Sequence, residues 1–264
     1  MSNVPKYCTV NFDTHFKVFH ELMSIKVLEL LLVASPYDAY ILEEDVSLAS
    51  KIINEYRGLN LSRPPRITWV PSAVQALSAI EKKNFDLVLA MPHLDDMDTY
   101  SLGRAIKKKY PKLPVIMLAH GLKGPELNPE IQDAGAIDQI FIWSGDADLL
   151  LAIVKNVEDR LNVDRDTKQA MVRVLLMVED SPLYRSYLLP LIYKAVVRQT
   201  QKVLNESLNQ EHRLLKMRAR PKILVAENFE KAIFLFKKYK DFLFGVISDT
   251  RFPKKGRITE TGGV

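Results

Sequence analysis

Cysteine is almost absent from this chain of 264 residues, which contains only Cys8. A single thiol excludes an intramolecular disulfide framework and any metal site built from several cysteines. The chain also lacks an apolar run near the roughly 18 residues of a membrane span, because the longest candidate, Val27 to Ala34, is short and contains Glu29. The opening residues lack the profile of a signal peptide. We therefore expect a protein of the reducing cytoplasm, with no membrane partner.

A strong excess of charge is missing too, since 37 basic and 32 acidic residues leave a formal net charge of +5. This excess fits an ordinary solvated surface and does not require a stripe that binds nucleic acid. A basic cluster at Arg213, Lys216, Arg218, Arg220 and Lys222 is mostly explained by cations near a helix end. Nucleic acid is not expected as a partner.

Alternating apolar strand-like runs and helical patterns fill most of the chain. The predicted strands are 26–33, 67–70, 86–91, 114–119 and 138–143, and the predicted helices are 37–57, 72–84, 99–110, 124–134 and 145–162. Continuous Val, Leu and Ile strands separated by helices are typical of a parallel sheet covered on both faces. We predict an α/β fold with a doubly wound, five-stranded sheet in the first part.

The length and the 47% hydrophobic content predict two domains rather than one. Residues 1–25, with Phe12, Phe16, Phe19 and Leu22 at helical spacing, are interpreted as a helical extension. The charged stretch Asn162 to Lys168 is the predicted boundary between a first domain, 26–166, and a second, 170–264.

The second domain begins with a predicted strand at 173–178, followed by strands at 222–226 and 242–248 and a helix at 229–240. Two more strand–helix units would need about 50 residues, at about 30 for each strand–helix–strand unit. We therefore expect this domain to be incomplete after its third strand. A longer protein, a partner that supplies the missing strands and a natural remnant are the three explanations, and unpaired parallel edges favour the first.

The first helix of the second domain is predicted to be long, from 183 to about 217, because no Gly or Pro lies between Pro190 and Pro221. Val197, Leu204, Leu208 and Leu215 give it an apolar stripe longer than one sheet would cover. The stripe leaves two interpretations open, an intramolecular core or a homo-oligomer seam.

Carboxylates follow two predicted strands of the second domain. Glu179 and Asp180 close the first of these strands, and Asp249 closes the third. Ligands of a doubly wound sheet gather at the carboxyl ends of neighbouring strands, so we expect the three side chains to lie together. A hard divalent cation would relieve their repulsion, and Mg²⁺ is the predicted occupant. A solvated strand-end pair is the plainer alternative.

These residues resemble response-regulator receiver domains, CheY-like in fold, over about 26–162 and 172–256. The resemblance implies that Asp249 is a phosphoacceptor, that Glu179 and Asp180 are the acid pair, and that Arg251 offers a backbone carbonyl to Mg²⁺. It implies a histidine kinase or phosphotransfer protein as donor. The family also uses a Thr or Ser and a Lys after two later strands, which this chain does not reach.

In the first domain the resemblance is to the fold without the chemistry. Val33 and Ala34 replace the acid pair, Met91 stands at the acceptor position, Ala119 replaces Thr or Ser, and Trp143 follows Ile142 where Lys-Pro is expected. This domain is identified as a pseudo-receiver used for packing or recognition.

A weaker likeness extends over the whole chain. The segments Phe19 to Met23, Gly58 to Pro65 and Met217 to Leu224 resemble the amino-terminal region of bacterial proteins similar to phosphoenolpyruvate synthase. No nucleotide-binding or phosphohistidine segment of such an enzyme is visible, so the likeness implies a regulatory region whose catalytic domain lies elsewhere.

The leading hypothesis is a signalling module of a phosphorelay, not an enzyme, with a downstream catalytic or effector domain as partner. The alternative is a structural adaptor that is not phosphorylated. A DNA-binding regulator is disfavoured because no helix-turn-helix pattern follows. Other polar residues are interpreted as ordinary surface: His212 as a surface histidine, and Asp95, Asp96 and Asp98 as a solvated turn.

Overall fold

The computed structural model describes residues 21–44, 64–121, 135–204 and 218–250, with the backbone of two short strands at 252–254 and 257–259. The predictions for residues 1–20, for helix 124–134, for the segment 205–217 and for Arg251 lie outside the described residues. In the first unit the elements are β1 (Glu29–Val33), α2 (Pro36–Glu44), β2 (Arg66–Val70), α4 (Ala73–Lys82), β3 (Leu87–Ala90), α5 (Thr99–Lys109), β4 (Val115–Ala119) and β5 (Gln139–Ile142).

The first sheet has five parallel strands in the order β2-β1-β3-β4-β5, which is the flavodoxin-like order and confirms the predicted fold class. Helices α4 and α5 cover one face, where Ile80 and Leu102 pack against Val88. Leu42 of α2 packs on the other face. Strands β3 and β4 are apolar and buried along their whole length, as expected of a parallel sheet that is covered on both faces.

The second unit has a sheet of three parallel strands. Its elements are β6 (Val174–Val178), α7 (Pro182–Leu204), β7 (Lys222–Ala226), α9 (Phe229–Tyr239), a short 3₁₀ helix η2 (Lys240–Phe242) and β8 (Leu243–Ser248), with strand order β7-β6-β8. Helix α9 packs on one face of this sheet through Ala232 and Tyr239. A hairpin of β9 (Phe252–Lys254) and β10 (Arg257–Thr259) follows β8.

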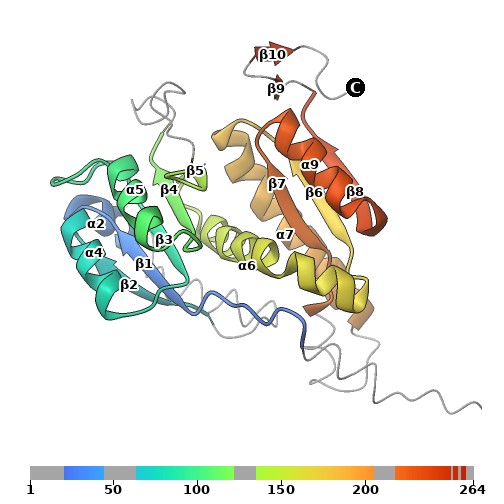
Figure 1. The fold of residues 1–264 in the computed structure, drawn as a ribbon, viewed down its shortest axis with the longest axis horizontal. Coiled ribbons are helices and arrows are strands. Elements are labelled where there is room, and N and C mark those ends of the chain that lie inside the picture. Colours follow the sequence, from blue (N-terminus) through green and yellow to red (C-terminus); the bar gives the residue numbers. More distant parts are fainter. Residues whose placement is uncertain are drawn as a thin grey trace, which may run out of the picture.

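Helix α6 (Ala147–Ala170) is longer than predicted, because the charged stretch 162–168 is helical and lies inside it. The sequence predicted a helix ending at 162. In Figure 1, α6 runs between the two sheets, and its Leu151 and Val157 belong to one apolar core with Leu32 of the first sheet and Met177 of the second. A helix buried on all sides can carry polar residues only where they are paired.

Some polar residues of α6 are buried and paired in a network. Asp159 accepts hydrogen bonds from both terminal nitrogens of Arg220, each at 2.8 Å, and from the Tyr193 hydroxyl at 2.7 Å. Asp166 lies 2.9 Å from the ammonium of Lys222, and both side chains are fully buried. These pairs join α6 to α7 and β7, so the two units share a core. The division into domains at 166–170 stays a prediction.

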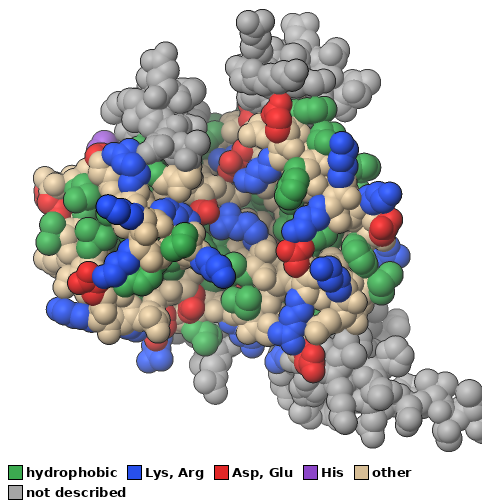
Figure 2. All heavy atoms as spheres, in the orientation of Figure 1, with side chains coloured by type: hydrophobic (Ala, Val, Ile, Leu, Met, Phe, Trp, Pro, Cys, Tyr) green, Lys and Arg blue, Asp and Glu red, His purple; other side chains and the backbone are tan. Residues whose placement is uncertain are grey.

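The surface is mixed in charge. On the face drawn in Figure 2, Lys and Arg are scattered over both units with Asp and Glu among them, as the small net charge leads one to expect. Among the described helices, none is both long enough and apolar enough to cross a membrane.

Candidate functional site

Strand register brings the predicted acidic residues together at the carboxyl edge of the second sheet. Val178 of β6 pairs with Ser248 of β8 on one side and with Ala226 of β7 on the other. The next residue on β6 is Glu179, and the next on β8 is Asp249. The amide of Asp249 donates to the carbonyl of Val178 at 3.0 Å, which holds the two strand ends in line.

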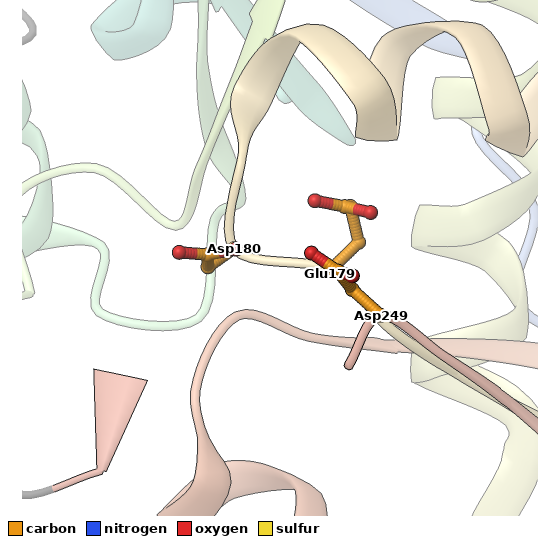
Figure 3. Close-up of side chains that lie close together, drawn as sticks. All are labelled: Glu179, Asp180 and Asp249. Atoms are coloured by element: carbon orange, nitrogen blue, oxygen red, sulfur yellow. The ribbon is translucent and has the colours of Figure 1, made fainter. Parts of the chain in front are cut away.

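One ligand oxygen from each of Glu179, Asp180 and Asp249 can lie within 4.8 Å of the others. This is the one group of three or more potential metal ligands among the described residues. Figure 3 shows Glu179 and Asp249 at the ends of their strands and Asp180 at the turn toward α7. The structure thus places these three residues together, as the sequence led us to expect, while the fourth predicted ligand, Arg251, lies outside the described residues.

Burial and mutual repulsion perturb the acid pair. Burial raises the pKa of Glu179, whose residue is only 5% exposed, and the charges of Asp249 and Asp180 raise it further. Burial also raises the pKa of Asp180, again with a contribution from Asp249. The amide of Ser181 opposes this by donating to Glu179 at 3.1 Å. Oxygen ligands that repel one another in this way are suited to a hard divalent cation.

Two charged residues that the sequence reasoning missed lie beside this cluster. Glu227 is the first residue after β7, so a fourth carboxylate follows a strand end. Arg185 of α7, almost fully buried, donates from Nη1 to the carbonyl of Glu179 at 3.1 Å and lies 3.7 Å from the Glu227 carboxylate. The position of Glu227 after an apolar strand was a signal in the sequence, whereas the contacts of Arg185 were not.

The equivalent edge of the first sheet is closed. Val33, Ala34, Met91 and Ala119 are completely buried there, and Trp143 is 5% exposed. The Met91 amide donates to Val33 at 2.8 Å, so this edge is filled by backbone pairing and apolar side chains. Nearby, His120 Nε2 lies 3.0 Å from Asp38 Oδ1.

The acidic loop 95–98 is more than the solvated turn that the sequence suggested. Asp96 accepts from the amides of Ala73 and Val74 at the start of α4, and Asp98 accepts from the amide of Ser101 as the N-cap of α5. Hydrogen bonds from backbone amides lower the pKa of Asp96 against the opposing effect of burial, and a hydrogen bond with Ser101 is the largest cause of the lowered pKa of Asp98. These carboxylates therefore act as helix caps.

The sequence matches no known protein-family profile and no curated protein. Among solved structures, the chain is similar to the signal receiver domain of an HD domain-containing protein from Pseudomonas fluorescens Pf-5, with 22% identity over 54% of this chain and 94% of that one and a TM-score of 0.38.

Two further similar structures are receiver domains or response regulators. The receiver domain of a sensor histidine kinase from Pseudomonas aeruginosa, with a magnesium ion in its active-site cleft, is 20% identical over 50% of this chain and 98% of that one, with a TM-score of 0.37. A response regulator from Thermotoga maritima in complex with Mg²⁺ and BeF is 19% identical over 49% and 98%, with a TM-score of 0.39.

Proposed function

We propose that the chain is a signal-transduction receiver module in which Asp249 of the second unit accepts a phosphoryl group and the first unit serves protein–protein contacts. The observation that carries the proposal is the meeting of Glu179, Asp180 and Asp249 at the carboxyl ends of two adjacent parallel strands. Ligand sites of doubly wound sheets lie at this edge.

In this role the Asp249 carboxylate is the nucleophile. One of its oxygens attacks phosphorus of the donor, a P–O bond forms, and the bond from phosphorus to the donor's leaving group breaks. The amide of Thr250, which donates to Asp249 Oδ1 at 2.5 Å, orients the carboxylate. Phosphoryl transfer depends on positioning and on stabilisation of charge rather than on further covalent chemistry.

Mg²⁺ fits the donor set because all three side-chain ligands are carboxylates and two of them have raised pKa values. The proposed ligands are oxygens of Glu179, Asp180 and Asp249 with the backbone carbonyl of Arg251. The cation would supply positive charge for the phosphoryl oxygens. A histidine kinase or phosphotransfer protein is the proposed donor.

The first unit is proposed to be a pseudo-receiver. Its carboxyl edge has Ala34 and Met91 at the register positions of Glu179 and Asp249 in the second unit, and both apolar residues are buried. A role in contacts, with the other unit and with a downstream catalytic or effector domain, is consistent with this edge.

The test is phosphorylation of the whole chain by a small acyl phosphate, such as acetyl phosphate, with Mg²⁺ and measurement of the intact mass. Wild type should gain one phosphoryl group and Asp249→Asn none. The control Asp241→Asn makes the same chemical change before the amino end of β8 and should still be modified. A wild-type chain that gains no mass, and that gives no fluorescence response to Mg²⁺ with beryllofluoride, would contradict the proposal.

The second candidate is a structural adaptor of an enzyme similar to phosphoenolpyruvate synthase. The buried ion pairs Asp159–Arg220 and Asp166–Lys222 and the core shared around α6 favour it, because they hold the two units in one geometry. An adaptor predicts no phosphorylation and an unchanged structure when the cation is added.

A further inference from the structure

Arg185 connects the carboxylate cluster to the first sheet. Its residue is 2% exposed and lies one turn into α7. Nη1 donates to the carbonyls of Glu179 and Asp180, at 3.1 and 3.5 Å, and Nη2 donates to the carbonyl of Ile140 on β5 at 2.7 Å. The guanidinium also lies 5.5 Å from the centre of the Phe141 ring. One side chain therefore touches both units.

The charge of Arg185 is the nearest buried positive charge to the cluster that the described contacts show. An arginine stays protonated in proteins, so this charge is permanent. Both Glu179 and Asp180 experience it, since the charge of Arg185 lowers the pKa of each carboxyl against the raising effects. Because the guanidinium is buried, salt screens it weakly. Arg185 contacts Glu179 and Asp180 through their backbone carbonyls, and the carboxylate that it pairs with is that of Glu227, 3.7 Å away. At longer range its charge offsets part of the negative charge of the cluster, and it must repel any cation that enters.

The contacts with β5 make the same side chain a link between the units. Strand β5 is an edge strand of the first sheet, and α7 lies along its free side. The carbonyl of Ile140 accepts a hydrogen bond from Arg185, and the amide of Ile142 donates to the hydroxyl of Ser186 at 2.7 Å. These two residues of α7 therefore satisfy backbone groups of the edge strand, as an uncovered edge requires.

We propose that Arg185 is a resident counter-cation of the carboxylate cluster, which weakens divalent-cation binding there and couples occupancy of the cluster to strand β5 of the first unit. The inference rests on the proposed cation site. A bound divalent cation neutralises the carboxylates, so their electrostatic attraction for Arg185 becomes weaker. The hydrogen bond from Arg185 to the carbonyl of Ile140 can then change in length or break. The first unit then takes part in the response to the cation, because its edge strand β5 accepts the hydrogen bond from Nη2 of Arg185.

The experiment is a Mg²⁺ titration of the full chain by calorimetry, in wild type, Arg185→Gln, Arg185→Lys and Ser186→Ala. Arg185→Gln removes the positive charge of the guanidinium. The variant should bind Mg²⁺ about tenfold more tightly, because the divalent ion is no longer repelled by a guanidinium a few ångströms away. Arg185→Lys keeps the charge and should stay near wild type. Ser186→Ala removes the other bond to β5 without a change of charge and should leave the affinity unchanged. A merely structural role for Arg185 predicts weaker binding or none in Arg185→Gln.

A second measurement reports on β5 itself. Trp143 follows Ile142 and is buried, and the other tryptophan, Trp69, can be replaced by phenylalanine so that Trp143 is the sole reporter. Mg²⁺ should change Trp143 emission in the Trp69→Phe protein, and Arg185→Lys in the same background should lose most of that change, because lysine lacks the second nitrogen that reaches Ile140. If Arg185→Gln does not fold, this comparison still tests the link.

The outcomes separate the two proposals. Mg²⁺ binding by wild type with equal or weaker affinity in folded Arg185→Gln, or an unchanged Trp143 response in Arg185→Lys, overturns the role of Arg185 and leaves the cation site standing. Binding by Arg185→Gln alone supports the role of Arg185 strongly. No binding by any variant overturns the cation site and this inference with it.

Discussion

Glu179 shows most clearly how a single residue is perturbed by its place at a strand end. Its carboxyl is buried and faces two other carboxylates, so its pKa in the folded protein is raised above the ordinary value. In the linkage relation, the folded state then binds more protons than the unfolded state, and stability falls as the pH rises through this window. Without a cation, the cluster therefore costs stability at neutral pH.

We predict that Glu179→Gln raises the free energy of unfolding at pH 7 by about 1 kcal/mol when no divalent cation is present. Wild type should become more stable as the pH falls from about 7 toward the ordinary carboxyl range, because the carboxyl of Glu179 is then protonated. The variant should lack this contribution. Urea unfolding at several pH values measures both effects. Saturating Mg²⁺ should reverse the order, since binding stabilises only wild type.

The control for this prediction is Glu81→Gln, the same chemical change on the surface. Lys109 lowers the pKa of Glu81 through a hydrogen bond, so this carboxylate is favourable rather than strained, and its replacement should not stabilise the protein. Equal stabilisation by the two variants would mean that the gain at Glu179 has nothing to do with the cluster.

The three carboxylates could be predicted from the sequence because each directly follows an apolar strand run, and parallel strands end at a common edge. Arg185 could not. It reaches across from a helix to the carbonyls of Glu179 and Ile140, which are 39 residues apart in numbering, and a backbone carbonyl leaves no mark on the sequence.

At the scale of elements, the strands were predicted to within about three residues because most of them are short apolar runs rich in Val, Leu and Ile, bounded by polar residues. Strand β1, for example, begins at Glu29 rather than at 26. Helix α6 was predicted too short. Its charged stretch after 161 suggested solvent, but Asn162, Asp166 and Thr167 are buried and hydrogen-bonded. Among them, Asp166 meets Lys222, which is distant in the sequence.

Helix α6 ends at a strained residue. Met171 has φ 53° and ψ 31°, a left-handed conformation that suits glycine, and 64% of the residue is exposed. We predict that Met171→Gly raises the free energy of unfolding by about 1 kcal/mol, because glycine adopts this conformation without the penalty of a Cβ atom. Thermal or urea unfolding measures the change.

Met171→Ala separates conformation from the loss of the side chain, since alanine keeps the Cβ atom. It should give no such gain. If alanine stabilised the protein as much as glycine, exposure of the methionine side chain and not the backbone would be the cause.

At the scale of the whole molecule, α6 and α7 make the two sheets parts of one core. Leu32, Met177 and Val225 belong to the same apolar cluster although they come from different sheets. Elements that pack into the same apolar core lose their mutual contacts together, which favours opening of both sheets in one cooperative step. We therefore expect amide hydrogen exchange in β4 and in β6 to report the same opening free energy.

Asp159→Asn tests whether the two sheets open together by removing one charge from the buried network. It leaves the Arg220 guanidinium without its charged partner and should cost about 3 to 5 kcal/mol, lowering exchange protection in both sheets alike. The surface variant Glu81→Gln should leave exchange protection in both sheets nearly unchanged, because an exposed ion pair contributes little to stability. Loss of protection confined to β6 and β7, with β4 unchanged, would show that the units open separately.

The amino-acid sequence alone was enough to predict the fold class, the five parallel strands of the first sheet and the position of the acidic residues at strand ends. These features follow from the spacing of apolar residues, the alternation of strands and helices, and the common edge at which parallel strands end. All three are visible in short stretches of the sequence. The three-dimensional packing was needed to show that α6 continues through the expected boundary, that Asp159 and Asp166 are buried in ion pairs, and that Arg185 joins the cluster to β5. Each of these features depends on contacts between residues that are far apart in the sequence. A charged residue has the same local sequence whether water surrounds it or a buried partner neutralises it.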